Sequence, residues 1–195
     1  MNETWNVSEI FYSLAGEGSL VGLPMIFIRL SGCNIHCQFC DQKKSWEDGK
    51  QMTWQEIYDE IVDFPCHNVC ITGGEPFLQN LIKLTQELHD KDYFISIETN
   101  GAIYQSIQVD LVIISPKKEI DKNLTLWNDI EWKFVIENEA SFEKIYNCEI
   151  GYEEVYLQPV NNNPEVIKLC VNKILDEGHR NWRLSLQTHK ILEIK

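Results

Sequence analysis

The sequence lacks any long apolar run and any run of basic residues. No apolar stretch approaches the roughly 20 residues that a membrane-spanning helix needs, and the opening residues "MNETWNVSEIF" show neither the basic nor the apolar segment of a secretion signal. Lys and Arg number 17 against 30 Asp and Glu, a formal charge of −13, which repels nucleic-acid phosphates. We therefore expect a soluble cytoplasmic protein that binds neither membranes nor nucleic acid.

The clustered cysteines are one short of a closed metal site. Seven cysteines, an odd number, without a secretion signal favour reduced thiols or metal ligation over a disulfide framework. In "GCNIHCQFCD", Cys33, Cys37 and Cys40 have a C-x3-C-x2-C spacing, whereas a structural zinc ion or an iron–sulfur cluster ordinarily takes four ligands. Either a neighbour such as His36 or Asp41 completes a zinc site, or a cluster keeps one coordination position open for a ligand that is not protein.

Short β-rich runs alternate with helical patterns along the chain, which indicates an α/β fold. The length of 195 residues suits one domain, and no linker or repeat divides it, so we expect a single domain over residues 1–195. Strands are predicted at residues 7–12, 25–30, 69–72, 93–98, 111–115, 132–136, 154–158 and near 183–186. Helices are predicted from Thr53, whose capping box with Glu56 opens a helix to about residue 63, over residues 78–88, and from Asn163 to Gly178.

Polar motifs follow most of the predicted strands. "AGEG" comes after the first strand, the cysteine loop after the second, "GGEP" after the third, "TNG" after the fourth, "SPKK" after the fifth and "QPV" after the seventh. In parallel α/β sheets and barrels, ligands bind at the carboxyl edge of the strands. The placement therefore favours one shared site at this edge over ordinary turn chemistry.

The cysteine spacing, with the aromatic Phe39 directly before the last cysteine, resembles the signature of the radical S-adenosylmethionine (SAM) superfamily. The segment "ITGGEP", residues 71–76, resembles the second motif of that superfamily. The resemblance implies that Cys33, Cys37 and Cys40 hold a [4Fe–4S] cluster and that SAM itself is the fourth ligand. The missing fourth cysteine is then a requirement of the chemistry.

A closer resemblance, to the 7-carboxy-7-deazaguanine synthase family, covers nearly the whole chain. It is carried, in the family's order, by "EIFYSLAGEG", "FIRLSGCN", "CQFCD", "ITGGEP", "ETNG", "SPK", "WKFVI", "LQPV" and "LSLQTHKIL". It implies an incomplete (βα) barrel with a mostly parallel sheet, usually a homodimer, and an external electron donor of the flavodoxin or ferredoxin type. The implied reaction is a lyase-type ring contraction of 6-carboxy-5,6,7,8-tetrahydropterin to 7-carboxy-7-deazaguanine with loss of ammonia, in queuosine and 7-deazapurine biosynthesis. SAM would be regenerated and Mg²⁺ would assist.

The same resemblance implies roles for individual residues. For the substrate it implies Glu17 as an acceptor for ring N–H groups, Arg29 as a planar fork for a carboxylate, and Thr72 and His189. For SAM it implies the following set: Phe39, Gly74, Glu75, Glu98, Ser115, Lys117 and Gln158. For Mg²⁺ it implies Asp41 and Gln42.

Two positions depart from the family pattern. Ala15 stands where the family usually has Gln, so one amide contact to the substrate ring is missing, and Gln42 stands where a Thr or Ser hydroxyl usually binds Mg²⁺. An amide oxygen can bind a hard cation, but the longer side chain would shift the ion. Two alternatives therefore stay open. One is a radical SAM enzyme acting on another small heterocycle, and the other is a zinc-binding interaction module built on the three loop cysteines and His36, without catalysis.

Overall fold

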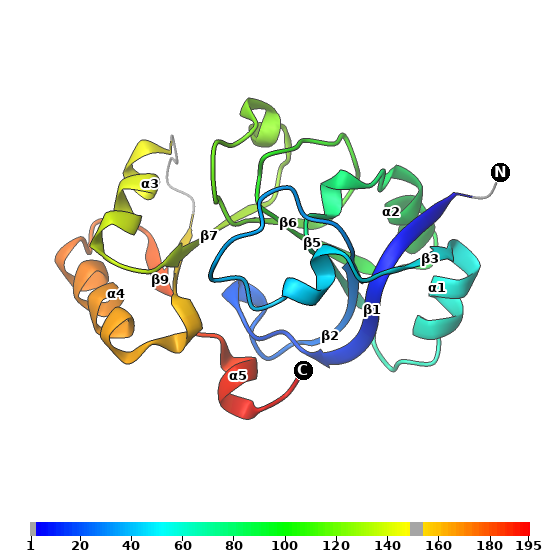
Figure 1. Cartoon of the computed structure of the whole chain (residues 1–195), viewed down its shortest axis with the longest axis horizontal. Coiled ribbons are helices and arrows are strands. Elements are labelled where there is room, and N and C mark those ends of the chain that lie inside the picture. Colours follow the sequence, from blue (N-terminus) through cyan, green and yellow to red (C-terminus); the bar gives the residue numbers. More distant parts are fainter. Residues whose placement is uncertain (1–2, 149–153) are drawn as a thin grey trace.

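The β-rich runs assemble into one curved sheet in the computed structural model, which describes residues 3–148 and 154–195 (Figure 1). The strands within those residues are β1 (Thr4–Leu14), β2 (Pro24–Leu30), β3 (Lys50–Thr53), β4 (Asn68–Gly73), β5 (Phe94–Thr99), β6 (Leu111–Ile114), β7 (Ile130–Ile136), β8 (Val155–Pro159) and β9 (Trp182–Leu184). They lie in the order β3-β1-β2-β4-β5-β6-β7-β8-β9. Every neighbouring pair from β2 to β9 is parallel, whereas β1 is antiparallel to β2 and β3. The parallel strands therefore end at one common edge.

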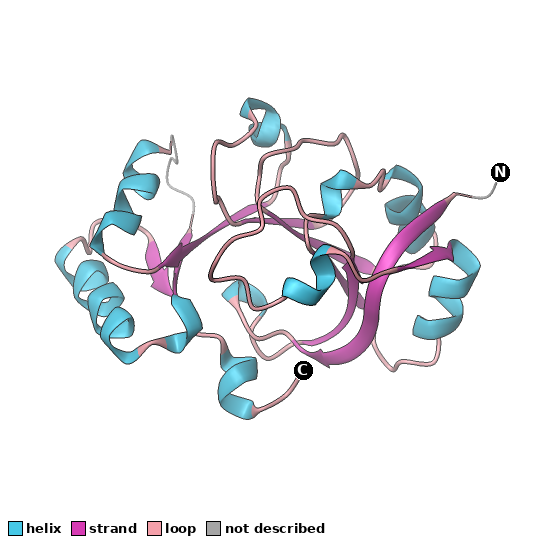
Figure 2. Ribbon diagram, in the orientation of Figure 1, coloured by secondary structure: helices cyan, strands magenta, loops and turns pink. Residues whose placement is uncertain are grey.

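Helices surround this sheet (Figure 2). In the described residues they are α1 (Trp54–Ile61), α2 (Ile82–His89), α3 (Phe142–Asn147), α4 (Pro164–Asp176) and α5 (Thr188–Leu192). Figure 1 shows α1 and α2 beside the N-terminal strands and α3 and α4 beside β7 and β9, while the loop after β2 lies across the open side of the sheet. None of the helices in the described part of the chain is long and apolar enough to cross a membrane.

Two helix starts follow directly from the sequence. The predicted capping box opens α1, because Thr53 Oγ1 accepts a hydrogen bond from the Glu56 backbone N–H at 3.3 Å and Glu56 Oε2 accepts one from the Thr53 N–H at 2.8 Å. At the start of α4, Asn163 Oδ1 accepts hydrogen bonds from the backbone N–H groups of Glu165 (2.9 Å) and Val166 (3.3 Å). These bonds satisfy donors that the first turn of a helix leaves free.

Alternation along each strand separates an apolar core from a polar inner face, because successive side chains point to opposite faces of a sheet. On β7, Trp132 and Phe134 are buried in the main apolar core together with residues from α1 to α4. Lys133 and Val135, between and beyond them, line a cavity on the other face. The curved sheet therefore packs its outer face against helices and presents charged side chains to its concave side.

The expected α/β class with a mostly parallel, incompletely closed sheet is confirmed, and every predicted strand is present. The sequence patterns do not predict β3, α3 or α5, which have only four, six and five residues and show no full period. Leu78, expected at the start of the second helix, lies instead in a separate 3₁₀ turn, Pro76–Leu78.

Candidate active site

A cavity of about 500 Å³ opens at the carboxyl edge of the parallel strands. Its wall is formed by strand ends, by the loop after β2 and by the start of α5. All but one of the predicted site residues line it, namely Glu17, Arg29, Cys33, Cys37, Phe39, Cys40, Asp41, Gln42, Thr72, Gly74, Glu98, Ser115, Lys117, Gln158 and His189. The motifs that follow separate strands in the sequence thus meet in one place, and the exception is Glu75.

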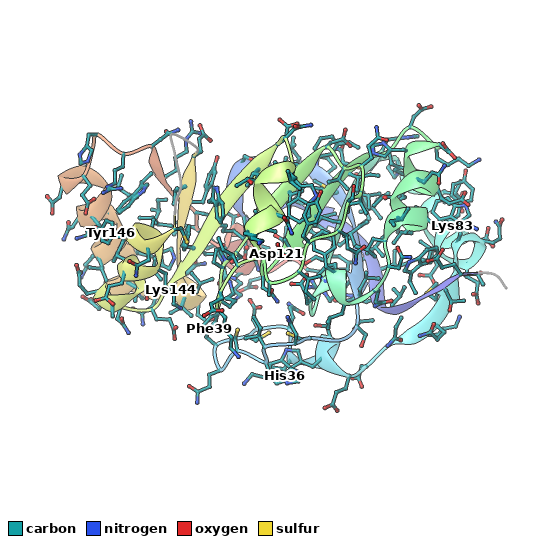
Figure 3. The ribbon with its side chains drawn as sticks, turned by 90° about the horizontal axis from the view of Figure 1, so that it is seen from above. His36, Phe39, Lys83, Asp121, Lys144 and Tyr146 are labelled. Carbon is teal, nitrogen blue, oxygen red and sulfur yellow. The ribbon has the colours of Figure 1, made fainter. Side chains whose placement is uncertain are left out.

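The cluster loop, residues 31–49, carries the three predicted ligand cysteines beyond the end of β2. Figure 3 shows this loop, with His36 and Phe39 labelled on it, lying outside the edge of the sheet. Its base is closed by a hydrogen bond from the Gly32 N–H to the Ser45 carbonyl at 2.9 Å. The cysteines of the loop are free thiols and partly exposed: Cys33, Cys37 and Cys40.

The thiols fit an iron–sulfur cluster with one open position. All three line the same cavity, from a single loop, and thiolates are the usual protein ligands of such clusters. Among the described residues, no three His, Cys, Asp or Glu side chains converge on one ion. A cubane does not require that convergence, because each thiolate binds a different iron. The cavity beside the loop leaves space for a ligand that is not protein at the fourth iron.

The "GGEP" turn is fitted against the base of the cluster loop. The Glu75 N–H donates to the Gly32 carbonyl at 2.7 Å, and the Gly74 N–H donates to the Leu30 carbonyl at 3.1 Å. A Cβ on Gly74 would lie 1.9 Å from the Gly32 carbonyl oxygen and 3.2 Å from Cys33 Cβ. Glycine is therefore required here for the close approach of two backbones, and the turn and the loop form one unit.

Glu75 differs from its expected place, because its side chain is only 1% exposed and does not line the cavity. Its carboxylate accepts hydrogen bonds from Thr99 Oγ1 (2.8 Å), the Asn100 N–H (2.7 Å) and the Phe77 N–H (3.1 Å). Burial raises the pKa of Glu75. Asn100 Nδ2 in turn donates to Asn34 Oδ1 of the cluster loop at 2.8 Å. The Glu75 side chain thus joins the "GGEP" and "ETNG" turns beneath the site.

Glu17 and Glu98 both form ion pairs with Lys133, a residue that was not among the predicted site residues. Lys133 Nζ donates to Glu17 Oε2 at 2.6 Å and to Glu98 Oε1 at 2.8 Å, and Thr72 Oγ1 donates to Glu98 Oε2 at 2.8 Å. Burial disfavours the charged forms, but the ion pairs outweigh it. They hold the pKa of Glu98 well below its ordinary value and the pKa of Lys133 above its own. Lys133 and Glu98 are therefore both charged at neutral pH.

Arg29 and His189 reach the cavity from β2 and α5. Arg29 Nε donates to Glu9 Oε1 at 2.8 Å, which fixes the guanidinium. Within the described residues its terminal amino groups have no hydrogen-bond partner, so they can pair with a carboxylate. His189 lies directly over Gly16, where a Cβ would stand 2.2 Å from His189 Nδ1. The histidine ring thus sits against the backbone one residue before Glu17.

Three predicted SAM residues lie along the later strand ends. Lys117 Nζ donates to Ser115 Oγ and lies 5.9 Å from the centre of the Phe39 ring. Burial lowers the pKa of Lys117 to about 8. Burial also raises the pKa of Cys37, an effect that the positive charge of Lys117 opposes.

Gln158 Oε1 is buried and has no partner within the described residues, so it can accept a hydrogen bond from a ligand in the cavity.

Asp41, assigned by resemblance to Mg²⁺, is already ion-paired. Asp41 Oδ2 accepts hydrogen bonds from Lys190 Nζ at 2.7 Å and from Gln187 Nε2 at 3.2 Å. Burial acts to raise the pKa of Asp41, but Lys190 and Gln187 outweigh it and lower the pKa. The Gln42 carbonyl accepts from Ser45 Oγ at 2.7 Å, and the Gln42 side chain lines the cavity. A lysine ammonium therefore occupies one oxygen of the carboxylate proposed as a metal ligand.

A cysteine loop at the carboxyl edge of an open parallel sheet, with a cavity beside it, is the arrangement expected of a radical SAM enzyme. A family model described as "Radical SAM superfamily" matches residues 27–114, which run from β2 through the cluster loop to the end of β6.

Full-length relatives narrow this class. The chain is 40% identical to a 7-carboxy-7-deazaguanine synthase of Bacteroides thetaiotaomicron, over 97% of this chain and 98% of the relative. It is 32% identical to the enzyme of the same name from Buchnera aphidicola, over 97% and 98% of the two chains. A solved structure titled "Crystal structure of QueE from Escherichia coli" superposes with a TM-score of 0.82 at 26% identity, covering 94% of each chain. The chain therefore belongs to the 7-carboxy-7-deazaguanine synthase family.

Several side chains that build the site belong to no motif that predicts a functional role. Lys133 did leave a signal, because a charged residue inside the otherwise apolar strand "WKFVI" needs a buried partner. Gln187 Nε2 donates to Glu17 Oε1 at 2.9 Å across most of the chain length, and no local pattern predicts such a contact. Asn100 appears in the quoted "ETNG" motif, but its bond to the cluster loop depends on the fold.

Proposed function

We propose that this chain catalyses the ring contraction of 6-carboxy-5,6,7,8-tetrahydropterin to 7-carboxy-7-deazaguanine with loss of ammonia. One observation carries the proposal beside family membership: a single cavity gathers the cluster cysteines and the four residues expected to hold the substrate, Glu17, Arg29, Thr72 and His189. Its volume of about 500 Å³ is that of a small-molecule site.

A [4Fe–4S] cluster and SAM, held by Cys33, Cys37, Cys40 and the "GGEP" turn, would supply the radical that removes a hydrogen atom from the substrate. The chain itself binds and orients the pterin. The Glu17 carboxylate accepts N–H groups of the pyrimidine ring, and the Arg29 guanidinium pairs with the substrate carboxylate. These contacts fix the reacting carbon relative to the cofactor, which is the main contribution a protein makes to such a step.

Part of the cavity wall is apolar. Apolar side chains of Leu20, Met25 and Phe27 line it between the charged groups. Apolar surroundings strengthen the polar contacts that a ligand makes beside them. Ala15, which replaces the amide usual in the family, lies in the same wall and packs with Met25.

We further propose a cytoplasmic homodimer, one radical SAM domain over residues 1–195, and an external electron donor of the flavodoxin or ferredoxin type. Family resemblance supports all of these. Exposed apolar side chains around the β1–β2 hairpin, Tyr12, Leu14, Val21 and Leu23, support a dimer face there. Light scattering on the anaerobic protein tests the dimer, and cluster reduction by added flavodoxin tests the donor.

Anaerobic purification followed by turnover tests the function. The protein should be brown, with about four irons per chain, and should convert the carboxytetrahydropterin to 7-carboxy-7-deazaguanine and ammonia while SAM is recovered. A protein with a full cluster and bound SAM that leaves this pterin unchanged would point to another small heterocycle. A colourless protein with stoichiometric zinc would point to the interaction module.

A further inference from the structure

We propose that Lys133 is a positioning residue, whose ammonium group fixes the Glu17 and Glu98 carboxylates side by side in the cavity wall as acceptors for N–H groups of the substrate. The proposal rests on the proposed function and adds to it a residue that acts through others. It also places Glu98, expected beside SAM, in the same charged group as Glu17.

The position of Lys133 in the sheet is the first support. It lies in the middle of β7, on the concave face, and only 6% of its side chain is exposed. An ammonium this buried is stable only with charged partners, and it has two, Glu17 Oε2 at 2.6 Å and Glu98 Oε1 at 2.8 Å. These partners come from the turn after β1 and from β5, so one lysine joins two walls of the cavity.

The remaining oxygens of the two carboxylates are held as well. Glu17 Oε1 accepts from Gln187 Nε2 at 2.9 Å, and Glu98 Oε2 accepts from Thr72 Oγ1 at 2.8 Å. Each carboxylate oxygen can accept about two hydrogen bonds, so each keeps capacity for one more. Both carboxylates are thus fixed in orientation and still able to receive donors from a ligand in the cavity.

The same strand also holds the backbone beside Glu17. Glu131, two residues before Lys133 and on the same face, accepts a hydrogen bond at Oε2 from the Ser19 N–H at 3.0 Å. Gly18 lies so close that a Cβ would stand 2.0 Å from Glu131 Oε1. Strand β7 therefore positions both the side chain of Glu17 and the turn that carries it.

The charges around the pair explain why the lysine is needed. The titratable groups that face it are Arg29 from β2, Cys70 from β4, Glu98 from β5, Lys117 after β6, Glu131 from β7 and Glu17 after β1. Arg29 is paired with Glu9. Without Lys133, two neighbouring carboxylates would lack their shared cation, and like charges in a buried site favour protonation of one of them. A protonated carboxyl loses acceptor capacity for the substrate.

Lys133→Met, which keeps most of the length and removes the charge, tests the role. We expect the KM for the pterin to rise about tenfold or more, the loss of a charged hydrogen bond, with iron content unchanged. The acid limb of the kcat/KM profile should move to higher pH, because Glu98 without the Lys133 charge takes up a proton more easily. Lys133→Arg should keep the wild-type acid limb. Lys168→Met, which removes an exposed lysine paired with Glu165 at 3.0 Å, is the matched control.

Lys133→Met leaves an unbalanced buried charge that can prevent folding. The double variant Lys133→Met/Glu98→Gln removes this surplus, so it should fold and still show the raised KM. A folded Lys133→Met with wild-type KM and an unmoved acid limb would overturn the proposal, and so would a folded double variant with wild-type KM. Failure of the wild-type enzyme to convert the pterin would instead reject the proposed function.

Discussion

The carbonyl oxygen of Gly32 lies so close to the α-carbon of Gly74 that a Cβ there would stand 1.9 Å from it. Gly32 lies at the base of the cluster loop, and Gly74 lies in the turn expected to contact the amino end of SAM. Because the Glu75 N–H also donates to Gly32 at 2.7 Å, the position of the turn and that of the cysteine ligands depend on each other.

Gly74→Ala should therefore reduce both SAM binding and the iron content after reconstitution, because the methyl group forces the base of the cluster loop to move. Gly178→Ala is the control, since a Cβ there would make only ordinary contacts, 3.5 Å from the Leu175 carbonyl oxygen and 4.0 Å from that of Ile174. Iron and sulfide analysis with equilibrium SAM binding measures both effects. A folded Gly74→Ala protein with full iron content and weakened SAM binding would show that the two loops move independently.

The cysteines should divide into two groups. Replacing any one of Cys33, Cys37 and Cys40 by Ala should abolish stable cluster binding, because two thiolates cannot anchor the cubane. Cys70→Ala, in a strand with the thiol buried, should leave the iron content intact and lower the free energy of unfolding by about 1 kcal/mol. Iron content and thermal unfolding separate these outcomes. A Cys37→Ala enzyme with a full cluster and wild-type turnover would show that the ligand assignment is wrong.

The longer strands and the helices with an apolar stripe were predictable, because the repeat of apolar residues that marks each of them is visible within a short stretch of sequence. The capping box of Thr53 and Glu56 is likewise a local pattern, and it forms as expected. The four-residue strand β3 was not predictable, because it pairs with β1 only once the cluster loop has brought it there.

The site was predictable as a set of motifs but not as a network. The positions of the predicted strand ends indicated which residues lie at the same edge of the sheet. These positions did not predict that Lys133 forms ion pairs with Glu17 and Glu98, because the three residues are far apart in the chain. They also did not predict that the side chain of Glu75, which follows two glycines, is buried in the protein.

Arg29 should prove to be a substrate contact that lysine cannot replace. Its Nε is fixed by Glu9, so its two terminal amino groups present a planar fork that an ammonium cannot reproduce. Arg29→Lys should raise the KM for the pterin about tenfold, while Glu9→Gln, which keeps an acceptor for Nε, should have a smaller effect. Steady-state kinetics of the two variants measures these effects. A wild-type KM in Arg29→Lys would show that Arg29 does not bind the substrate carboxylate.

Glu131 should make the stability of the protein depend on pH. Burial raises the pKa of Glu131, so the folded protein binds this proton more tightly than the unfolded chain does. Its contribution to stability is then complete below the ordinary pKa of a glutamate and declines as the pH rises above it. Glu131→Gln keeps an acceptor for the Ser19 N–H but carries no charge. The Tm of this variant minus the Tm of the wild type should therefore be larger at pH 8 than at pH 5.5. A Tm difference that is the same at both values would contradict this.

Magnesium should stimulate the enzyme, in competition with a lysine. If Asp41 and Gln42 form one side of a hard-cation site completed by waters and the substrate carboxylate, an ion must compete with Lys190, which lies 2.7 Å from Asp41 Oδ2. Lys190→Met should then lower the Mg²⁺ concentration needed for half-maximal turnover, and Gln42→Thr, which restores the family's hydroxyl, should keep or increase the stimulation. If instead the Gln42 amide N–H₂ donates to the substrate carboxylate and no ion binds, turnover should be indifferent to chelation. Turnover measured across a Mg²⁺ titration after chelator treatment distinguishes the two cases, and a flat response in all three proteins would rule out the metal.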